Sequence, residues 1–261
     1  MRLGVIIDEG SFYAPRILAR SSLREDHDVV GVWTREPGDP IASRLRNALN
    51  VSGPRYTIDR AGALSRLRRQ RKAELRSDVA AVDLEMPLIG DLEAMGLDRL
   101  SMSTANSKEF RTTIHDLGVD MLISLFYGEI LDPETFSAPR LGTINVHPSL
   151  LPALAGKNPV FWAMAEGLQS TGITIHEIDE GIDTGSILDQ SLIAIEPNET
   201  HHELYLKVSD VVAKRLPIAV LQRTKRPEER SEIASTSERS YRSTPTPESY
   251  RSFRSLGHRF L

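Results

Sequence analysis

An asparagine and a histidine stand one residue apart in GTINVHPSLLP, residues 142–152. Side chains two positions apart in a β-strand project to the same side, so Asn145 and His147 can face one reacting centre. A carboxamide N–H can donate to an oxyanion, and an imidazole can move a proton near neutral pH. Pro148 ends the strand and Pro152 shapes its exit. The pattern predicts a polar pair fixed at a strand end, although an isolated pair of this kind is more often a turn cap and a structural histidine.

Alternating strands and helices are predicted to position this pair. Compact apolar runs predict strands, and capped or amphipathic stretches predict helices. The expected strands are 2–7, 28–34, 120–127 and 142–147, with edge or hairpin strands at 171–179 and 186–195. The expected helices are 13–23, 107–117, 158–167 and a long one after Thr200 that is interrupted near Pro217. The alternation predicts an α/β fold with a mainly parallel sheet and helices on both faces, whose ligands bind at the carboxyl ends of the strands.

Composition limits the class of protein. The chain has 261 residues, of which 40% are hydrophobic and 26% charged, as expected for one globular domain with or without an appendage. Its formal charge of −4 supplies no long-range attraction to nucleic acid or to an anionic membrane. The absence of cysteine excludes disulfides, thiolate metal sites and a cysteine nucleophile. The first apolar run is too short for a signal peptide or a spanning helix, so we expect a cytoplasmic protein.

Two segments depart from the alternating pattern. Residues 41–77 resemble an insertion and include a basic amphipathic stretch, which could be a solvated helical face or a patch for a phosphorylated ligand. Residues 223–261 are rich in Ser, Arg, Glu, Thr and Pro and cannot form a core of their own. They nevertheless contain Tyr241, Tyr250, Phe253 and Phe260. We therefore expect a main domain over 1–222 and a short C-terminal extension that packs against it.

The run from about Asp120 to Gln190 resembles the folate-dependent formyltransferase family. The resemblance is carried by YGEIL, NVHPSLLP, TGITIH and IDTGSIL, and more loosely by the N-terminal β-α-β pattern; 41–77 and the tail match nothing. It implies a Rossmann-like catalytic domain that transfers the formyl group of 10-formyltetrahydrofolate to an amine without a metal. The family's catalytic trio falls on Asn145, His147 and Asp183. Asp183 alone would be an Asx turn, but within this motif its carboxylate could raise the histidine pKa or hold the amine in line.

The resemblance also places the pterin ring of the donor between residues 126–131 and 176–183. Glycines there let backbone approach a flat heterocycle, and aliphatic side chains supply an apolar wall. The simpler alternative, core strand plus turn, suits Phe126 best. The expected donor-binding residues are Phe126, Tyr127, Gly128, Ile130, Leu131, His176, Ile178, Asp179 and Gly181.

The identity of the acceptor is inferred by excluding other substrates. The stretch DEGSFY after the first strand is not a glycine-rich phosphate loop, which disfavours a glycinamide ribonucleotide. The 38 residues after Arg223 are too few for a folded tRNA domain, and the chain begins without the regulatory domain usual in deformylases. The motifs NPVFWA and IDTGSIL most resemble those of the sugar N-formyltransferases, so a small amine on a nucleotide-linked sugar is the predicted acceptor.

Candidate acceptor contacts are Asp8 and Glu9, which would attract an ammonium, together with Lys157 and Asn158. The phosphates of the acceptor would be met by basic side chains in 66–76 or by Lys157. A methionyl-tRNA formyltransferase, a deformylase and a non-catalytic folate-binding protein stay open as alternatives. No nucleic-acid or membrane partner is expected, and a homodimer is possible.

Overall fold

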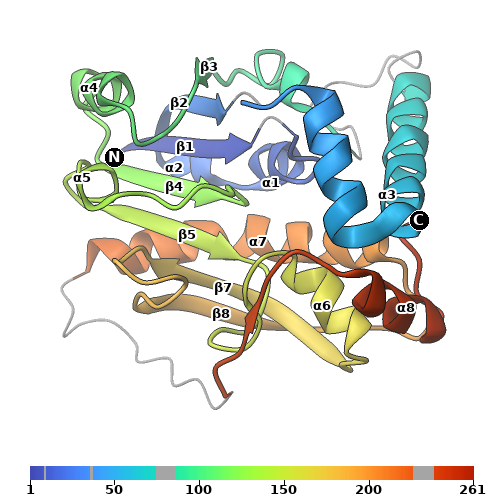
Figure 1. Ribbon diagram of the computed structural model, residues 1–261. Helices are drawn as coiled ribbons and strands as arrows, with labels where there is room; N and C mark the ends of the chain where they lie inside the picture. The colour runs from blue at the N-terminus through green and yellow to red at the C-terminus, as the bar shows by residue number, and fades with distance from the viewer. Residues whose placement is uncertain (9, 36–37, 75–85, 226–237) are drawn as a thin grey trace.

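A seven-stranded sheet lies at the centre of the computed structural model, which describes residues 1–8, 10–35, 38–74, 86–225 and 238–261 (Figure 1). Its strands are β1 (Arg2–Asp8), β2 (Asp28–Arg35), β3 (Arg99–Met102), β4 (Met121–Leu125), β5 (Thr143–His147), β7 (Ser170–Glu177) and β8 (Ile187–Ala194). The spatial order is β3-β2-β1-β4-β5-β7-β8. The first five strands in chain order pair in parallel, and β7 and β8 form an antiparallel hairpin on the β5 edge. The predicted α/β class and the hairpin are both confirmed.

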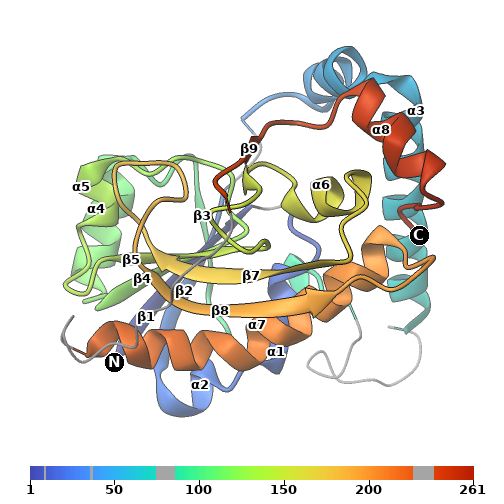
Figure 2. The ribbon, with the colours of Figure 1, turned by 90° about the horizontal axis from the view of Figure 1, so that it is seen from below.

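Helices cover both faces of this sheet, as Figure 2 shows. The helices are α1 (Ala14–Arg20), α2 (Leu23–Asp26), α3 (Ile41–Glu74), the 3-10 helix η1 (Ile89–Asp91), α4 (Lys108–Asp116), α5 (Pro133–Phe136), α6 (Pro159–Ala165), α7 (His201–Thr224) and α8 (Pro247–Ser255). Helices α1 and α7 pack against one face, where α7 also contacts β7 and β8. Helix α4 covers part of the opposite face, hereafter the front face.

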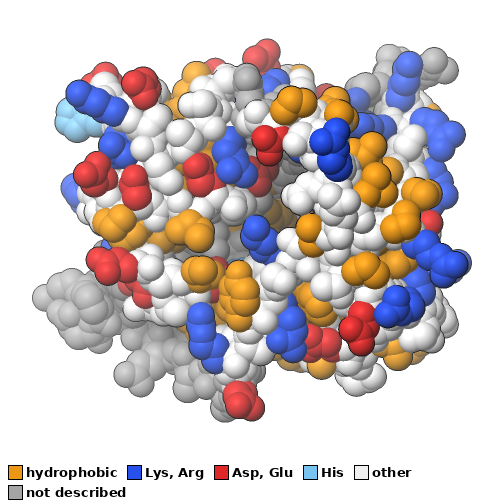
Figure 3. Space-filling model, viewed as in Figure 1, with side chains coloured by type: hydrophobic (Ala, Val, Ile, Leu, Met, Phe, Trp, Pro, Cys, Tyr) orange, Lys and Arg blue, Asp and Glu red, His pale blue; other side chains and the backbone are white. Residues whose placement is uncertain are grey.

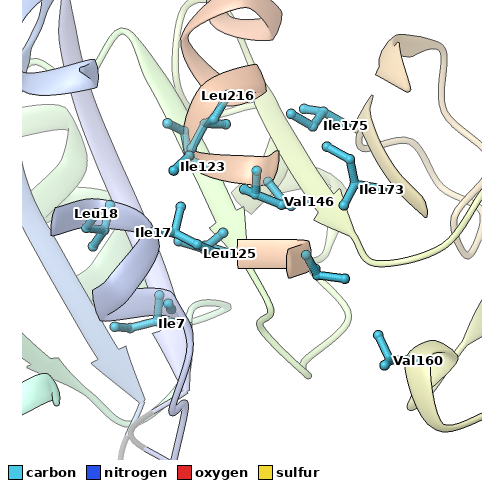
Figure 4. Packing of buried hydrophobic residues seen from close by; sticks show 14 of the residues in the cluster. Ile7, Ile17, Leu18, Ile123, Leu125, Val146, Val160, Ile173, Ile175 and Leu216 are labelled. Carbon is cyan, nitrogen blue, oxygen red and sulfur yellow. The ribbon is translucent and has the colours of Figure 1, made fainter. Parts of the chain in front are cut away.

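The alternation along the strands divides the core between the two faces. In β1, Leu3, Val5 and Ile7 belong to the large cluster beneath α1 and α7, whereas Ile6 belongs to a smaller front cluster with Phe110 of α4. Figure 4 shows the large cluster, in which side chains from β1, β4, β5 and β7 meet residues from α1 and α7. Because the apolar residues of β5 point to this back cluster, its intervening residues must point to the front face.

An interruption of the last helix near Pro217 was predicted, but α7 is continuous from His201 to Thr224. A proline inside a helix costs about 3 kcal/mol relative to alanine because it removes a donor and crowds the preceding turn. Here the cost is offset by a buried stripe at helical spacing that packs against the sheet: Leu204, Val208, Val212, Leu216 and Val220. The predicted helix 13–23 also differs, because it ends at Arg20 and a separate short helix begins at Leu23.

The insertion and the C-terminal residues meet beyond the carboxyl ends of the strands. Helix α3 is two helices joined at a kink, because Gly53 has a φ of 81°. Residues 75–77 of the predicted insertion lie outside the described residues. After a short strand β9 (Tyr241–Arg242), which pairs in parallel with β6 (Ala155–Gly156), α8 contacts α3 and α6. Tyr250, Phe253 and Phe260 are buried in the large core cluster. The last 24 residues thus form part of the fold.

Candidate functional site

Three polar side chains form a row across β4, β5 and β7 on the front face. In the strand register, Ser124 is paired with Asn145, and Asn145 with His176. The Ser124 hydroxyl donates to Asn145 Oδ1 over 2.8 Å, and Asn145 Nδ2 lies 3.2 Å from His176 Nε2. His176 Nδ1 is 2.7 Å from the Glu177 carbonyl oxygen. This last contact requires a proton on Nδ1, so Nε2 accepts and the amide must present its N–H₂ group to it.

This row fixes the orientation of the Asn145 carboxamide. One amide N–H donates to His176, and the hydroxyl of Ser124 satisfies the amide oxygen. The second amide N–H is left for a ligand, as an oxyanion donor requires. Burial, and next the charge of His147, lower the pKa of His176, so its imidazole stays neutral and continues to accept.

We expect Ser124→Ala to lower kcat roughly fivefold, because one neutral hydrogen bond that orients the amide is lost, about 1 kcal/mol in free energy. Among the described residues, the Ser124 hydroxyl hydrogen-bonds only to Asn145, so the effect should disappear in an Asn145→Ala background. Steady-state kinetics on the two single variants and the double variant measure this coupling. Equal losses in both backgrounds would contradict an orienting role.

His147 occupies the next front-face position of β5 and is 4% exposed. Its Nε2 lies 3.0 Å from the carbonyl oxygen of Leu154, and this contact assigns the proton of the neutral ring to Nε2. Nδ1 is then an acceptor, and it faces Asp183 Oδ2 at 3.7 Å. If Nδ1 takes up a proton, both ring N–H groups point at oxygen atoms. The imidazole is therefore arranged to receive one proton on Nδ1.

Asp183 lies between the two histidines. Its Oδ1 is 3.7 Å from His176 Nε2, its Oδ2 is 3.7 Å from His147 Nδ1, and Oδ2 accepts the N–H of Gly156 over 2.8 Å. Asp183 has a φ of 52°, a left-handed conformation that aspartate tolerates better than most residues. Both histidine distances are too long for direct hydrogen bonds. The carboxylate is held by backbone and can close on a protonated His147.

The groups that hold the trio were not predicted from the sequence. Leu154 and Gly156 contribute only backbone atoms, which residue type does not reveal. The loop after His147 is held by a second front-face row: Thr174 donates to the Ser149 carbonyl and accepts from both Leu151 N–H and Gln190. Alternation predicts that Ser124 and Thr174 face the front, but nothing in the sequence predicts the cross-strand register.

The two segments predicted to hold the donor lie on either side of β5, after β4 and after β7. Ile130 is 71% exposed in the first, and Ile182 is 41% exposed in the second, so each offers apolar surface. Ile178 donates its N–H to the Thr143 carbonyl, and Asp179 accepts from Gly181 N–H and from Thr184. Leu131 is buried in the front cluster and offers little surface. The side chain of His176, also predicted to bind the donor, already accepts a hydrogen bond from Asn145.

Phe126, Tyr127 and Gly128 form the turn after β4. Phe126 has a φ of 53° and packs edge-on against Tyr205 of α7 with centroids 6.2 Å apart. The Tyr127 hydroxyl donates to Glu129, and the Arg35 guanidinium lies 4.9 Å from the Tyr127 ring centroid. Partial burial alone would raise the pKa of Glu129, but hydrogen bonds from Thr104, Tyr127 and the Ala105 N–H lower it. The turn is thus anchored by a charged network.

Asp8 belongs to the same network. Arg35 Nη2 lies 2.7 Å from Asp8 Oδ1, and Gly128 N–H donates to Asp8 Oδ2 over 2.9 Å. Asp8 was predicted to attract an ammonium group, but these contacts already balance most of the negative charge of its carboxylate. Glu9 lies outside the described residues. Lys157 is exposed and its N–H donates to the Arg242 carbonyl, while Asn158 begins α6 in a left-handed conformation without a side-chain cap bond.

The neutral histidines predict a loss of stability in acid. The pKa of His201, at the start of α7, is lowered to about 3 by burial and then by the charges of Arg60 and His202. In the unfolded chain both His176 and His201 titrate near pH 6.5. Below that pH the unfolded state therefore binds more protons than the folded state, in which both pKa values are lowered. The free energy of unfolding should fall by about 1–3 kcal/mol between pH 7.5 and 5.5.

Urea unfolding at these two pH values measures the fall. His201→Asn should reduce it, and His115→Asn, at an exposed position of α4, should leave it unchanged. An equal pH dependence in the His201 variant and the parent would contradict the assignment.

Within the described ranges, no three His, Asp or Glu side chains are grouped as metal ligands would be. None of the helices in those ranges combines the length and apolarity that crossing a membrane requires.

Comparison with known proteins identifies the family. Residues 1–220 match the protein family described as formyl transferase. The chain belongs to the formyl transferase family. This confirms the family predicted from the motifs, and the match includes all three trio positions.

Similarity to individual proteins is more limited. A methionyl-tRNA formyltransferase of Synechococcus sp. (strain JA-3-3Ab) is 46% identical over 96 residues, which are 37% of this chain and 30% of that protein. One from Acetivibrio thermocellus is 36% identical over 53% of this chain and 47% of its own length. The chain therefore spans less than half the length of these curated relatives.

Among solved structures, a phosphoribosylglycinamide formyltransferase of Anaplasma phagocytophilum superimposes with a TM-score of 0.58 at 16% identity, covering 94% of this chain and 98% of that one. At this identity the likeness shows the fold alone.

Proposed function

We propose that the chain is an N-formyltransferase that moves the formyl group of 10-formyltetrahydrofolate to the primary amine of a small acceptor, a nucleotide-linked amino sugar. The observation that carries the proposal is the convergence of Asn145, His147 and Asp183 at the carboxyl end of β5, with one amide N–H and one imidazole nitrogen left for the reacting groups. Family membership gives independent support.

The donor would lie between the turn after β4 and the loop after β7. Ile130 and Ile182 give apolar surface to a flat ring, and backbone groups of both segments can read its edge. The donor supplies an activated formyl group on a nitrogen. Transfer forms a bond from the acceptor nitrogen to the formyl carbon, breaks the bond from that carbon to the donor nitrogen, and moves one proton between the two nitrogens.

The residues of the trio match these needs. The second Asn145 N–H donates to the formyl oxygen as it becomes negative, which oxyanion donors do for about 2.7–4 kcal/mol. His147 Nδ1 accepts the proton that leaves the acceptor nitrogen, and Asp183 Oδ2 holds the resulting imidazolium. The same proton then passes to the departing nitrogen, so His147 returns to its neutral form.

A second acceptor, methionyl-tRNA, is favoured by one observation, because the relatives of highest identity given above carry that name. Against it stands the formal charge of −4, since tRNA binding needs an extensive basic surface. The deciding experiment is a screen of amines with the purified chain and 10-formyltetrahydrofolate, detecting formylated products by mass and tetrahydrofolate by absorbance. Nucleotide-linked amino sugars should be formylated and should compete with any surrogate amine.

Two results would overturn the proposal. Formylation of methionyl-tRNA alone at physiological salt would establish the second acceptor. Binding of a formylfolate analogue by calorimetry, without release of tetrahydrofolate in the presence of any amine, would indicate a binding protein.

A further inference from the structure

A cavity of about 580 Å³ lies against the kinked helix α3, outside the catalytic trio. Its lining carries three guanidinium groups, from Arg44, Arg46 and Arg60, and one carboxylate, from Asp39. The first half of α3 supplies most of the wall, the second half supplies Arg60, and Thr244 closes one side. Figure 3 shows a recess in the front face with basic side chains nearby.

The kink in α3 is what brings these arginines together. Gly53 adopts a φ of 81°, and a Cβ at this position would meet Pro247 of α8 at 3.1 Å. The chain therefore turns sharply against α8, and the two halves of α3 both line one cavity. A straight helix would point Arg44 and Arg60 along a single rod, more than four turns apart.

The side chain of Arg60 is held in place by Tyr56. Its Nη1 donates to the Tyr56 hydroxyl over 2.8 Å. Tyr56 is 4% exposed and packs edge-on against Phe161, Tyr250 and Phe260 with centroids 5.4–5.7 Å away. A guanidinium has five N–H donors, so four of those on Arg60 are left for another partner.

The other two arginines lack a side-chain partner among the described residues. Neither Arg44 nor Arg46 makes an ion pair or side-chain hydrogen bond with any residue in the described part of the chain. Three like charges around one recess repel one another and concentrate anions there. The cavity volume is within the range of small-molecule sites, and guanidinium groups bind phosphate oxygens in pairs.

The segment that carries β9 leads from the cavity toward the catalytic trio. Thr244 lies two residues after Arg242, a span of about 7 Å at most. Arg242 pairs with Gly156, whose N–H holds Asp183. A ligand in the cavity could therefore extend an amine toward His147 along this strand.

We infer that the α3 cavity binds the diphosphate group of the acceptor. The inference rests on the proposed function and assigns to the insertion the recognition of a nucleoside diphosphate. A ligand with a single carboxylate would leave most of the guanidinium N–H donors without an acceptor. An RNA backbone needs an extended basic surface with several phosphate contacts, whereas these arginines converge in one recess.

Calorimetric titration of the full chain with uridine diphosphate and with inorganic pyrophosphate tests the inference. We expect Arg60→Met and Arg44→Met each to weaken the binding of both probes about tenfold or more, as loss of a charge-assisted phosphate contact should. Arg66→Met, on the same helix but outside the cavity lining, should change Kd less than about twofold. Because Arg60 contacts Tyr56, the Arg44 variant provides the measurement that does not depend on core packing.

Each outcome separates this inference from the proposed function. Binding of both probes that is equal in the parent and the Arg44 and Arg60 variants overturns the cavity assignment, whatever amine is formylated. A short RNA duplex that binds in an Arg44-dependent way while pyrophosphate does not bind also overturns it. Arginine-dependent binding of the probes without formylation of any amine supports the cavity and contradicts the proposed function.

Discussion

Asn145→Ala, His147→Ala and Asp183→Ala are each expected to lower kcat about a hundredfold or more while the protein stays folded. Loss of Asn145 removes the proposed oxyanion donor, which is worth about 2.7–4 kcal/mol in comparable sites. Loss of His147 removes the only imidazole nitrogen at the site that is left to take a proton, because His176 Nε2 already accepts from Asn145. Loss of Asp183 leaves a protonated His147 without its counter-charge.

The three effects should not add. Groups that act on the same proton and the same oxygen fail together, so the triple variant should be little slower than the slowest single variant. Stopped assays at saturating donor and acceptor measure kcat, and circular dichroism checks folding. Asp116→Ala, at an exposed position of α4, is the matched control. Full activity of His147→Ala at saturating donor would refute the mechanism.

Phe253→Ala should lower the free energy of unfolding by about 3–5 kcal/mol, the usual cost of removing a buried phenylalanine. Phe253 is 0% exposed and stacks on Phe161 of α6 with centroids 5.1 Å apart; it also contacts Tyr250 and Phe260. Removing its ring opens a cavity where α8, α6 and α3 meet. Since ordinary domains are stable by only about 5–15 kcal/mol, the loss is a large fraction of the total.

Urea unfolding of the variant and of Leu256→Ala measures the difference, because Leu256 lies three positions further along the chain and is 49% exposed. The control should change stability by less than about 1 kcal/mol. Formyl transfer should also become heat-sensitive in Phe253→Ala, because β9 and α8 belong to one segment and β9 borders Gly156. Equal stability of the Phe253 variant and the parent would show that the C-terminal segment does not contribute to the core.

Local sequence predicted most elements of this protein and the residue types of its candidate site. Apolar runs and caps predicted six strands of the central sheet and four helices to within a few residues, because periodicity reflects which face each element must bury. The exceptions follow the same physics: tertiary burial of one face of α7 kept Pro217 within a continuous helix. The short edge strand β3 and the helices α5 and α8 were not predicted. Asn145 and His147 could be placed on one face from their spacing alone, and the motif around them predicted the family that the comparison confirmed.

Only the tertiary structure decided how those groups are held. Ser124, Asn145 and His176 are far apart in sequence and meet because β5 lies between a parallel and an antiparallel partner, a register that depends on the packing of the whole sheet. The contacts of Leu154 and Gly156 use backbone atoms and so leave no trace in residue type. The arginine cavity arises from a kink that a single glycine permits, at a point where α8 from the far end of the chain packs closely against it.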